Sequence, residues 1–157
     1  MNANPGIQDH DVEEIATLLN TLLADEYALY TKTRNAHWNI DGPNFHELHE
    51  FFETQYETLD EMIDEIADRV RSLGYFALGS LKDFLSVTHL GEENHDFSDP
   101  KQIILTLFNN HETIIGIIRN DITPVSGKYR DLETCDFVTG LMGKHEKMAW
   151  MLRSYLA

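Results

Sequence analysis

Residues 45–73 have the sequence FHELHEFFETQYETLDEMIDEIADRVRSL, and their apolar side chains recur every three or four positions. Because an α-helix has 3.6 residues per turn, this spacing gathers those side chains on one helical face. A helix of this length is typical of a helical bundle. The apolar stripe that the period predicts consists of Phe45, Leu48, Phe52, Tyr56, Leu59, Ile63, Ile66, Val70 and Leu73.

The flanking sequence repeats the helical pattern with turn residues between the segments. Helical periods cover about 9–38, a segment starting at Pro100 and ending near Pro124 and Gly127, and about 131–155. Gly74 is expected to close the helix over 45–73, and a short helix is expected around 80–87. The long crossover that carries this short helix should join parallel neighbours. We therefore predict an all-α four-helix bundle with a short extra helix in the crossover.

Length and charge narrow the possible partners. At 157 residues the chain suits one domain, 1–157, with a short flexible N-terminus of about residues 1–8. Its one cysteine, Cys135, cannot pair within the chain, and no leader or long apolar run is evident, so we expect a cytoplasmic protein without a membrane span. The net charge of −15 makes metal ions better partners than DNA, although acidity by itself can serve solubility.

A histidine and three carboxylates share one side of the helix over 45–73. Successive 100° steps place His49, Glu53, Asp64 and Asp68 within roughly a 100° arc beside the apolar stripe. His37 lies at the end of the preceding helix and can join His49 across the short loop. Imidazole and carboxylate ligands together suit Fe(II) and its neighbours. A row of acids alone would more often be a solvated helix face.

These residues cannot all bind one metal ion within a subunit. Fifteen residues separate His49 from Asp64, which is about 22 Å of helix. A two-fold axis between Thr58 and Leu59 would lay two copies of the helix antiparallel and bring 49 beside 68 and 53 beside 64. The spacing therefore predicts two equivalent sites in a homodimer, each built from both chains.

Several segments resemble the Dps family of miniferritins, which belongs to the ferritin-like superfamily. The resemblance extends over nearly the whole chain and is most specific in the first two segments below. The matching segments are Asn35-Ala36-His37-Trp38-Asn39-Ile40-Asp41-Gly42, then Asp64-Glu65-Ile66-Ala67-Asp68-Arg69, Leu81-Lys82-Asp83-Phe84-Leu85, and the last helix from Asp136 to Arg153.

The resemblance implies a dodecameric shell with di-iron ferroxidase sites at its two-fold interfaces. It implies that Fe(II) is oxidised by hydrogen peroxide or oxygen and that Fe(III) is mineralised inside the shell, which protects the cell from oxidative stress. The metal ligands it implies are His37, His49, Glu53, Asp64 and Asp68. The lengths of the carboxylates at positions 53 and 68 are exchanged relative to the usual family pattern, which puts the binding of a second iron in doubt.

Three alternative functions make different predictions for this sequence. Some family members condense DNA through lysine-rich tails, but here no Lys or Arg precedes Lys32, so direct DNA binding is not expected. A di-iron site inside one bundle takes paired Glu-x-x-His motifs, and the one such spacing here is Glu92 to His95. A shell or metal buffer with little catalytic activity remains open.

The remaining candidates have structural alternatives. His111 and His145 fall on inward helix stripes, where hydrogen-bonded core histidines are the commoner outcome. Trp38 could quench radicals or pack at its helix end. The acids beside the turn before the last helix could line a pore or cap that helix: Asp121, Asp131, Glu133 and Asp136.

Overall fold

The computed structural model describes residues 5–92 and 96–157 of the chain, and the long elements there are all helices. Part of the expected flexible N-terminus, residues 1–4, and His95 of the Glu-x-x-His spacing lie outside the described residues. The elements are α1 Asp9–Asn39, α2 Phe45–Ser72, α3 Leu81–Val87, α4 Pro100–Ile117, the π-helical turn η1 Ile118–Ile122, α5 Thr123–Lys128 and α6 Leu132–Ser154. The described parts contain no strand, so the predicted all-α four-helix bundle with a crossover helix is confirmed.

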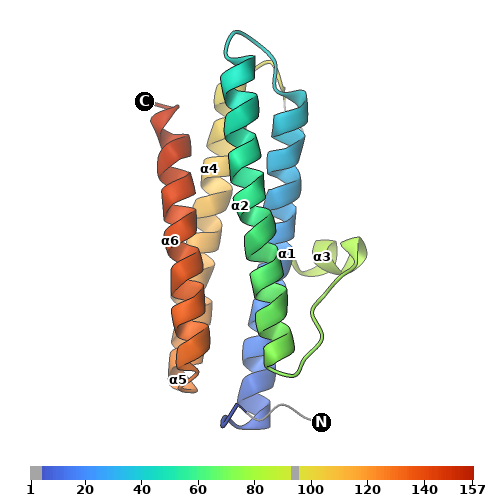
Figure 1. Cartoon of the computed structure of the whole chain (residues 1–157), viewed down its shortest axis with the longest axis vertical. Helices are drawn as coiled ribbons and strands as arrows, with labels where there is room; N and C mark the ends of the chain where they lie inside the picture. Colours follow the sequence, from blue (N-terminus) through green and yellow to red (C-terminus); the bar gives the residue numbers. More distant parts are fainter. Residues whose placement is uncertain (1–4, 93–95) are drawn as a thin grey trace.

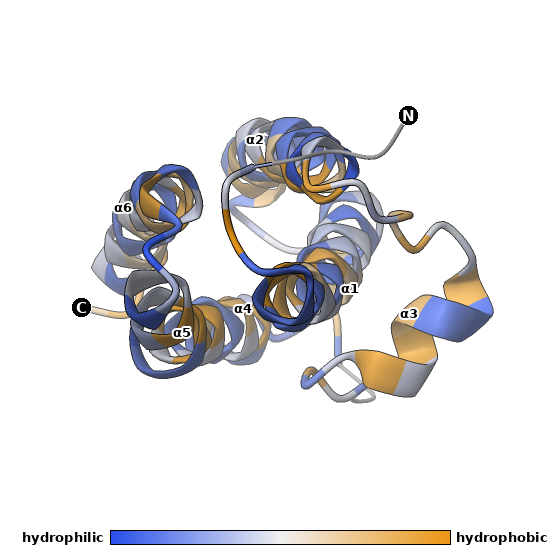
Figure 2. Ribbon diagram, turned by 90° about the horizontal axis from the view of Figure 1, so that it is seen from below, coloured by the Kyte–Doolittle hydropathy of each residue, from blue (hydrophilic) through white to orange (hydrophobic). Residues whose placement is uncertain are grey.

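The long helices α1, α2, α4 and α6 form the bundle, and α3 lies outside it against α1 (Figure 1). The turn between α1 and α2 lies at the same end of the bundle as the start of α4 and the C-terminus. The crossover joins helices that run in the same direction, as predicted. It was wrong to expect them to be neighbours, because α2 packs on α1 while α4 packs on α6 and α1, so α2 and α4 face each other diagonally (Figure 2).

Local chemistry explains where the helices begin and end. The carboxylate of Asp99 accepts hydrogen bonds from the backbone N–H groups of Lys101 and Gln102, and Pro100 occupies the first turn, where no N–H is needed. Ser80 caps α3 through the N–H of Asp83. Gly74 has φ of 91°, a conformation that glycine adopts without strain, and it closes α2 as predicted.

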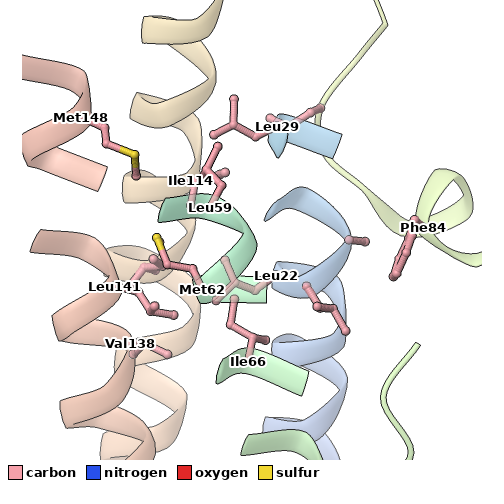
Figure 3. Close-up of a cluster of buried hydrophobic side chains, with 14 of the residues drawn as sticks. Leu22, Leu29, Leu59, Met62, Ile66, Phe84, Ile114, Val138, Leu141 and Met148 are labelled. Carbon is pink, nitrogen blue, oxygen red and sulfur yellow. The ribbon is translucent and has the colours of Figure 1, made fainter. Parts of the chain in front are cut away.

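The core is a continuous apolar cluster along the inside of the bundle, where side chains from α1, α2, α4 and α6 meet (Figure 3). The buried face of α2 is turned slightly from the predicted stripe. Gln55 and Met62 are buried, whereas Phe45 is 43% exposed and Tyr56 and Ile63 are only half-buried. A side chain such as Leu59, which is fully buried, contributes about 1.5–3 kcal/mol through its burial alone.

The third long helix was predicted to end near Pro124 and Gly127, and helical backbone continues past Pro124 as far as Lys128, divided into α4, η1 and α5. Proline lacks a backbone N–H and ordinarily breaks the hydrogen-bond ladder. Here the backbone widens into the π-helical turn η1, in which the N–H of Thr123 donates to the carbonyl of Ile118, five residues back. The wider turn shifts the bonding register just before Pro124, so the chain continues as α5.

Across the described residues, 5–92 and 96–157, no helix has the length and apolar character that crossing a membrane requires.

Candidate metal site at the ends of α1 and α2

His37 and His49 form a reciprocal pair where α1 ends and α2 begins. The imidazole Nδ1 of His37 lies 2.8 Å from the backbone carbonyl of His49, and the Nδ1 of His49 lies 2.7 Å from the carbonyl of His37. The rings stack with centroids 3.7 Å apart. A carbonyl oxygen can only accept, so each Nδ1 carries the proton. In the neutral imidazoles each Nε2 then presents a lone pair, which is the form that binds metal ions.

The loop geometry that creates this pair follows from the local sequence. Asn39 ends α1, Asp41 accepts a hydrogen bond from the N–H of Gly42, and α2 starts at Phe45. The two helices therefore run antiparallel from a tight turn, so the last turn of α1 faces the first turn of α2 (Figure 1). Phe45 covers His49 on its outer side, with ring centroids 5.1 Å apart. The turn brings the two histidines together, as the sequence predicted.

Glu53 lies one helical turn after His49 on α2 and is half-buried. Its Oε1 accepts a long hydrogen bond, 3.4 Å, from the hydroxyl of Tyr56. Burial, reinforced by the negative charge of Glu53, raises the pKa of Tyr56 above its ordinary value, so the phenol holds its proton. Glu53 is thus a carboxylate acceptor on the same helix as His49.

Asp64 and Asp68 are not part of this group within one subunit. Both are exposed on α2, which is one unbroken helix from Phe45 to Ser72, so the separation of about 22 Å between positions 49 and 64 holds in the structure. Among the described residues, no group of three or more His, Cys, Asp or Glu side chains is arranged to bind a metal ion. The single subunit therefore unites His37 and His49, with Glu53 near them, and leaves the two aspartates apart.

The sequence did not identify Tyr56 as a neighbour of the histidine pair or Arg34 as a neighbour of Tyr56. The rings in contact with His37 are those of His49 and Tyr56, the latter at 5.2 Å in an edge-to-face arrangement. The guanidinium of Arg34 lies 4.5 Å from the centre of the Tyr56 ring. Helical spacing could have predicted that both residues lie near the site, because Arg34 precedes His37 by one turn and Tyr56 follows Glu53 by one turn.

The turn before α6 separates the four acids that the sequence grouped there. Asp131 is buried, accepts a hydrogen bond from the N–H of Thr134 as the N-cap, and pairs with Arg69 of α2 at 2.9 Å. It therefore acts as a cap that ties α6 to α2. The other three acids are exposed: Asp121, Glu133 and Asp136.

Comparison with known proteins gives the family. Residues 16–157 match the model of the ferritin-like domain. An uncharacterized low temperature-induced protein of Nostoc is 40% identical over 98% of this chain and 86% of its own length. The DNA protection during starvation protein of Porphyromonas gingivalis is 34% identical over 96% and 93%.

Solved structures agree. A Dps protein of Vibrio cholerae, described as a member of a superfamily of ferritin-like diiron-carboxylate proteins, superposes with a TM-score of 0.92 at 30% identity, covering 100% of this chain and 98% of that one. Dps from Thermosynechococcus elongatus gives a TM-score of 0.87 at 31% identity, covering 92% and 91%. The chain belongs to the Dps family of ferritin-like proteins.

Proposed function

We propose that this protein oxidises Fe(II) with hydrogen peroxide and stores the ferric product in a shell of twelve subunits. The observation that carries the proposal is the histidine pair, because both Nδ1 atoms are engaged by carbonyls and both Nε2 atoms are left as metal ligands. Imidazole and carboxylate donors suit Fe(II). Descriptions of the relatives support iron chemistry and protection in general, since one is a ferritin-like diiron-carboxylate protein and another a DNA protection during starvation protein.

The complete site needs a second copy of the chain. Two antiparallel copies of α2, related by an axis between Thr58 and Leu59, bring Asp64 and Asp68 of one copy to His37, His49 and Glu53 of the other. Large apolar side chains exposed close together on the single subunit support such an assembly, because soluble monomers seldom expose large contiguous apolar patches. Beside the site these are Trp38 and Phe45, and on α3 they are Leu81 and Leu85, the last two more than 60% exposed.

The proposed site delivers two electrons to one oxidant. Hydrogen peroxide takes one electron from each of two Fe(II) ions and two protons, which gives two Fe(III) and two water molecules. Two metal ions held side by side by carboxylates and imidazoles deliver both electrons to one oxidant, so no hydroxyl radical is released. The iron is the substrate and cargo, and the protein supplies the ligands and the enclosed shell.

The net charge and the single cysteine bear on the binding partners and the cellular compartment of the protein. Each subunit contributes −15, so a shell attracts Fe(II) and repels the DNA backbone, and direct DNA binding is not proposed. Cys135 is a free thiol beside the hydroxyl of Ser126, which fits a reducing cytoplasm.

A complementation experiment tests the interfacial site. One variant, His37→Ala with His49→Ala, lacks the histidines, and another, Asp64→Asn with Asp68→Asn, lacks the aspartates. Each alone should lose rapid peroxide-dependent Fe(II) oxidation. When the two are unfolded and assembled together, half the dimers are mixed and one of the two sites in each is intact, so about a quarter of wild-type activity should return.

The control mixes the two variants after separate assembly, which should restore nothing. If the co-assembled variants stay inactive although mixed dimers are present, the ligands do not come from two chains. If the histidine variant alone keeps the wild-type rate, the chemistry lies elsewhere. Oxidation by the wild type no faster than in buffer would leave a shell or metal buffer as the function.

A further inference from the structure

A phenol that can be oxidised lies directly against the histidine pair. The ring of Tyr56 is 5.2 Å from that of His37, centroid to centroid, and its hydroxyl donates to Glu53. Glu53 can therefore accept the phenolic proton if Tyr56 loses an electron. Tyr56 is half-buried, which shields a radical there from other molecules. An electron donor and a proton acceptor thus stand together beside the candidate iron site.

Arg34 controls how Tyr56 can be oxidised. Its guanidinium lies 4.5 Å from the centre of the Tyr56 ring, and its Nη1 donates to the hydroxyl of Tyr30 at 2.6 Å, which fixes its position. A cation over the ring favours the neutral ring, whose face is negative, and opposes a positive ring radical. The electron must therefore leave together with the phenolic proton, and Glu53 is the acceptor within reach.

Other oxidisable rings nearby are Trp38 and Tyr30, the latter 6.1 Å from Tyr56 between centroids and hydrogen-bonded to Arg34. The Trp38 ring lies 5.1 Å from the guanidinium of Arg34, and 61% of the side chain is exposed in the subunit. The Tyr56 ring packs edge-to-face on that of His37, whereas Trp38 adjoins His37 along the backbone. Tyr56 combines a ring contact with His37 and a carboxylate that can accept its proton.

We propose that Tyr56 supplies the second electron when peroxide meets a site that holds a single Fe(II). This inference rests on the proposed ferroxidase function. One Fe(II) gives one electron, Tyr56 gives one electron and its proton, and one further proton is taken up. Hydrogen peroxide is reduced to two water molecules, leaving Fe(III) and a neutral tyrosyl radical. A later Fe(II) ion reduces the radical, and one proton restores the phenol.

A second electron donor is needed because the two Fe(II) ions reach the site one after the other. In the interval, peroxide and a single Fe(II) would exchange one electron and release a hydroxyl radical. With Tyr56 the half-filled site remains a two-electron donor. The role of Tyr56 should therefore be visible at one Fe(II) per site and vanish at two.

The test compares wild type, Tyr56→Phe and the control Tyr75→Phe. The hydroxyl of Tyr75 contacts the backbone of Asp9, far from the α1–α2 turn. Assembled apo protein is loaded without oxygen with one Fe(II) per site, given one equivalent of peroxide and frozen for EPR. Wild type and Tyr75→Phe should show a tyrosyl radical and little spin-trapped hydroxyl radical. Tyr56→Phe should lose the tyrosyl signal and release hydroxyl radical. At two Fe(II) per site the three proteins should behave alike.

A tyrosyl signal that survives in Tyr56→Phe, an indole radical in its place in wild type, or equal hydroxyl radical yields with and without the phenol would each overturn the inference. Its failure is distinguishable from failure of the ferroxidase itself. If wild type with two Fe(II) per site oxidises iron no faster than the histidine variant, the proposed function is lost. Rapid oxidation without a Tyr56 radical removes only the role of Tyr56.

Discussion

Two pairs of histidines in this protein have opposite surroundings. His111 of α4 and His145 of α6 are fully buried inside the bundle, with their Nδ1 atoms 2.8 Å apart, and the Nε2 of His145 lies 2.5 Å from the carboxylate of Glu26 on α1. His37 and His49 lie at a helix turn and use backbone carbonyls instead. The buried row, made of His111, His145 and Glu26, forms its hydrogen bonds within the chain. In the pair at the turn, backbone carbonyls engage both Nδ1 atoms, and the Nε2 atoms are the proposed metal ligands.

The difference also concerns protons. Burial, and then the neighbouring His145, lower the pKa of His111 well below its ordinary 6.5, so His111 stays neutral. Its Nε2 and the second oxygen of Glu26 are enclosed without a hydrogen-bond partner, which is costly for the fold. Histidines in a helical bundle can thus join helices through buried hydrogen bonds, as His111 and His145 do, or keep a ring nitrogen for a metal ion, as proposed for His37 and His49.

The largest effect is expected on removing the carboxylate of the buried row. Glu26→Ala leaves His145 without its acceptor inside the core and should lower the free energy of unfolding by about 3–5 kcal/mol. Glu53→Ala removes a half-exposed carboxylate and should change stability little. Urea unfolding of the apo proteins at one protein concentration, followed by circular dichroism, measures both. Equal losses of stability in the two variants would contradict the proposed difference between the two histidine pairs.

The second largest effect is expected in how the free energy of unfolding depends on pH, which should distinguish the two histidine pairs. Below pH 6.5 the unfolded chain protonates position 111 while the folded protein does not, so the unfolded state binds more protons and stability falls as pH falls. The dependence continues down to the lowered folded pKa and amounts to at most about 1.4 kcal/mol per pH unit. His111→Gln should reduce this slope, whereas His10→Gln, at an exposed position, should not. Identical slopes in both variants would show that His111 is protonated in the folded state.

The smallest effect on stability is expected at the turn. His49→Gln removes one ring hydrogen bond at a half-buried position and should cost about 1 kcal/mol or less in the apo protein, while Fe(II) binding weakens. Unfolding and anaerobic Fe(II) titration of the same sample measure both quantities. A loss of stability as large as that of Glu26→Ala would mean that this pair also holds the fold together.

Much of the fold and part of the site followed from the sequence. The helix boundaries at Asp9, Gly74 and Pro100 came from period and capping chemistry, which act within a few residues. The π-helical turn just before Pro124 was not predicted, because no local pattern marks such a turn. Gln55 was not expected inside, since its burial depends on the carbonyl of Met148, which lies on another helix.

The sequence by itself determined the helices, the acidic charge and the placing of His49, Glu53, Asp64 and Asp68 on one side of α2, because all of these depend on spacing along the chain. Only the tertiary structure decided which partners each side chain finds. The α1–α2 turn locks the tautomers of His37 and His49, and the packing of α1 on α2 places Arg34 over Tyr56. Glu26 meets His145 because α1 and α6 share a core. Such contacts join residues far apart in sequence, and their geometry is fixed only when the helices pack.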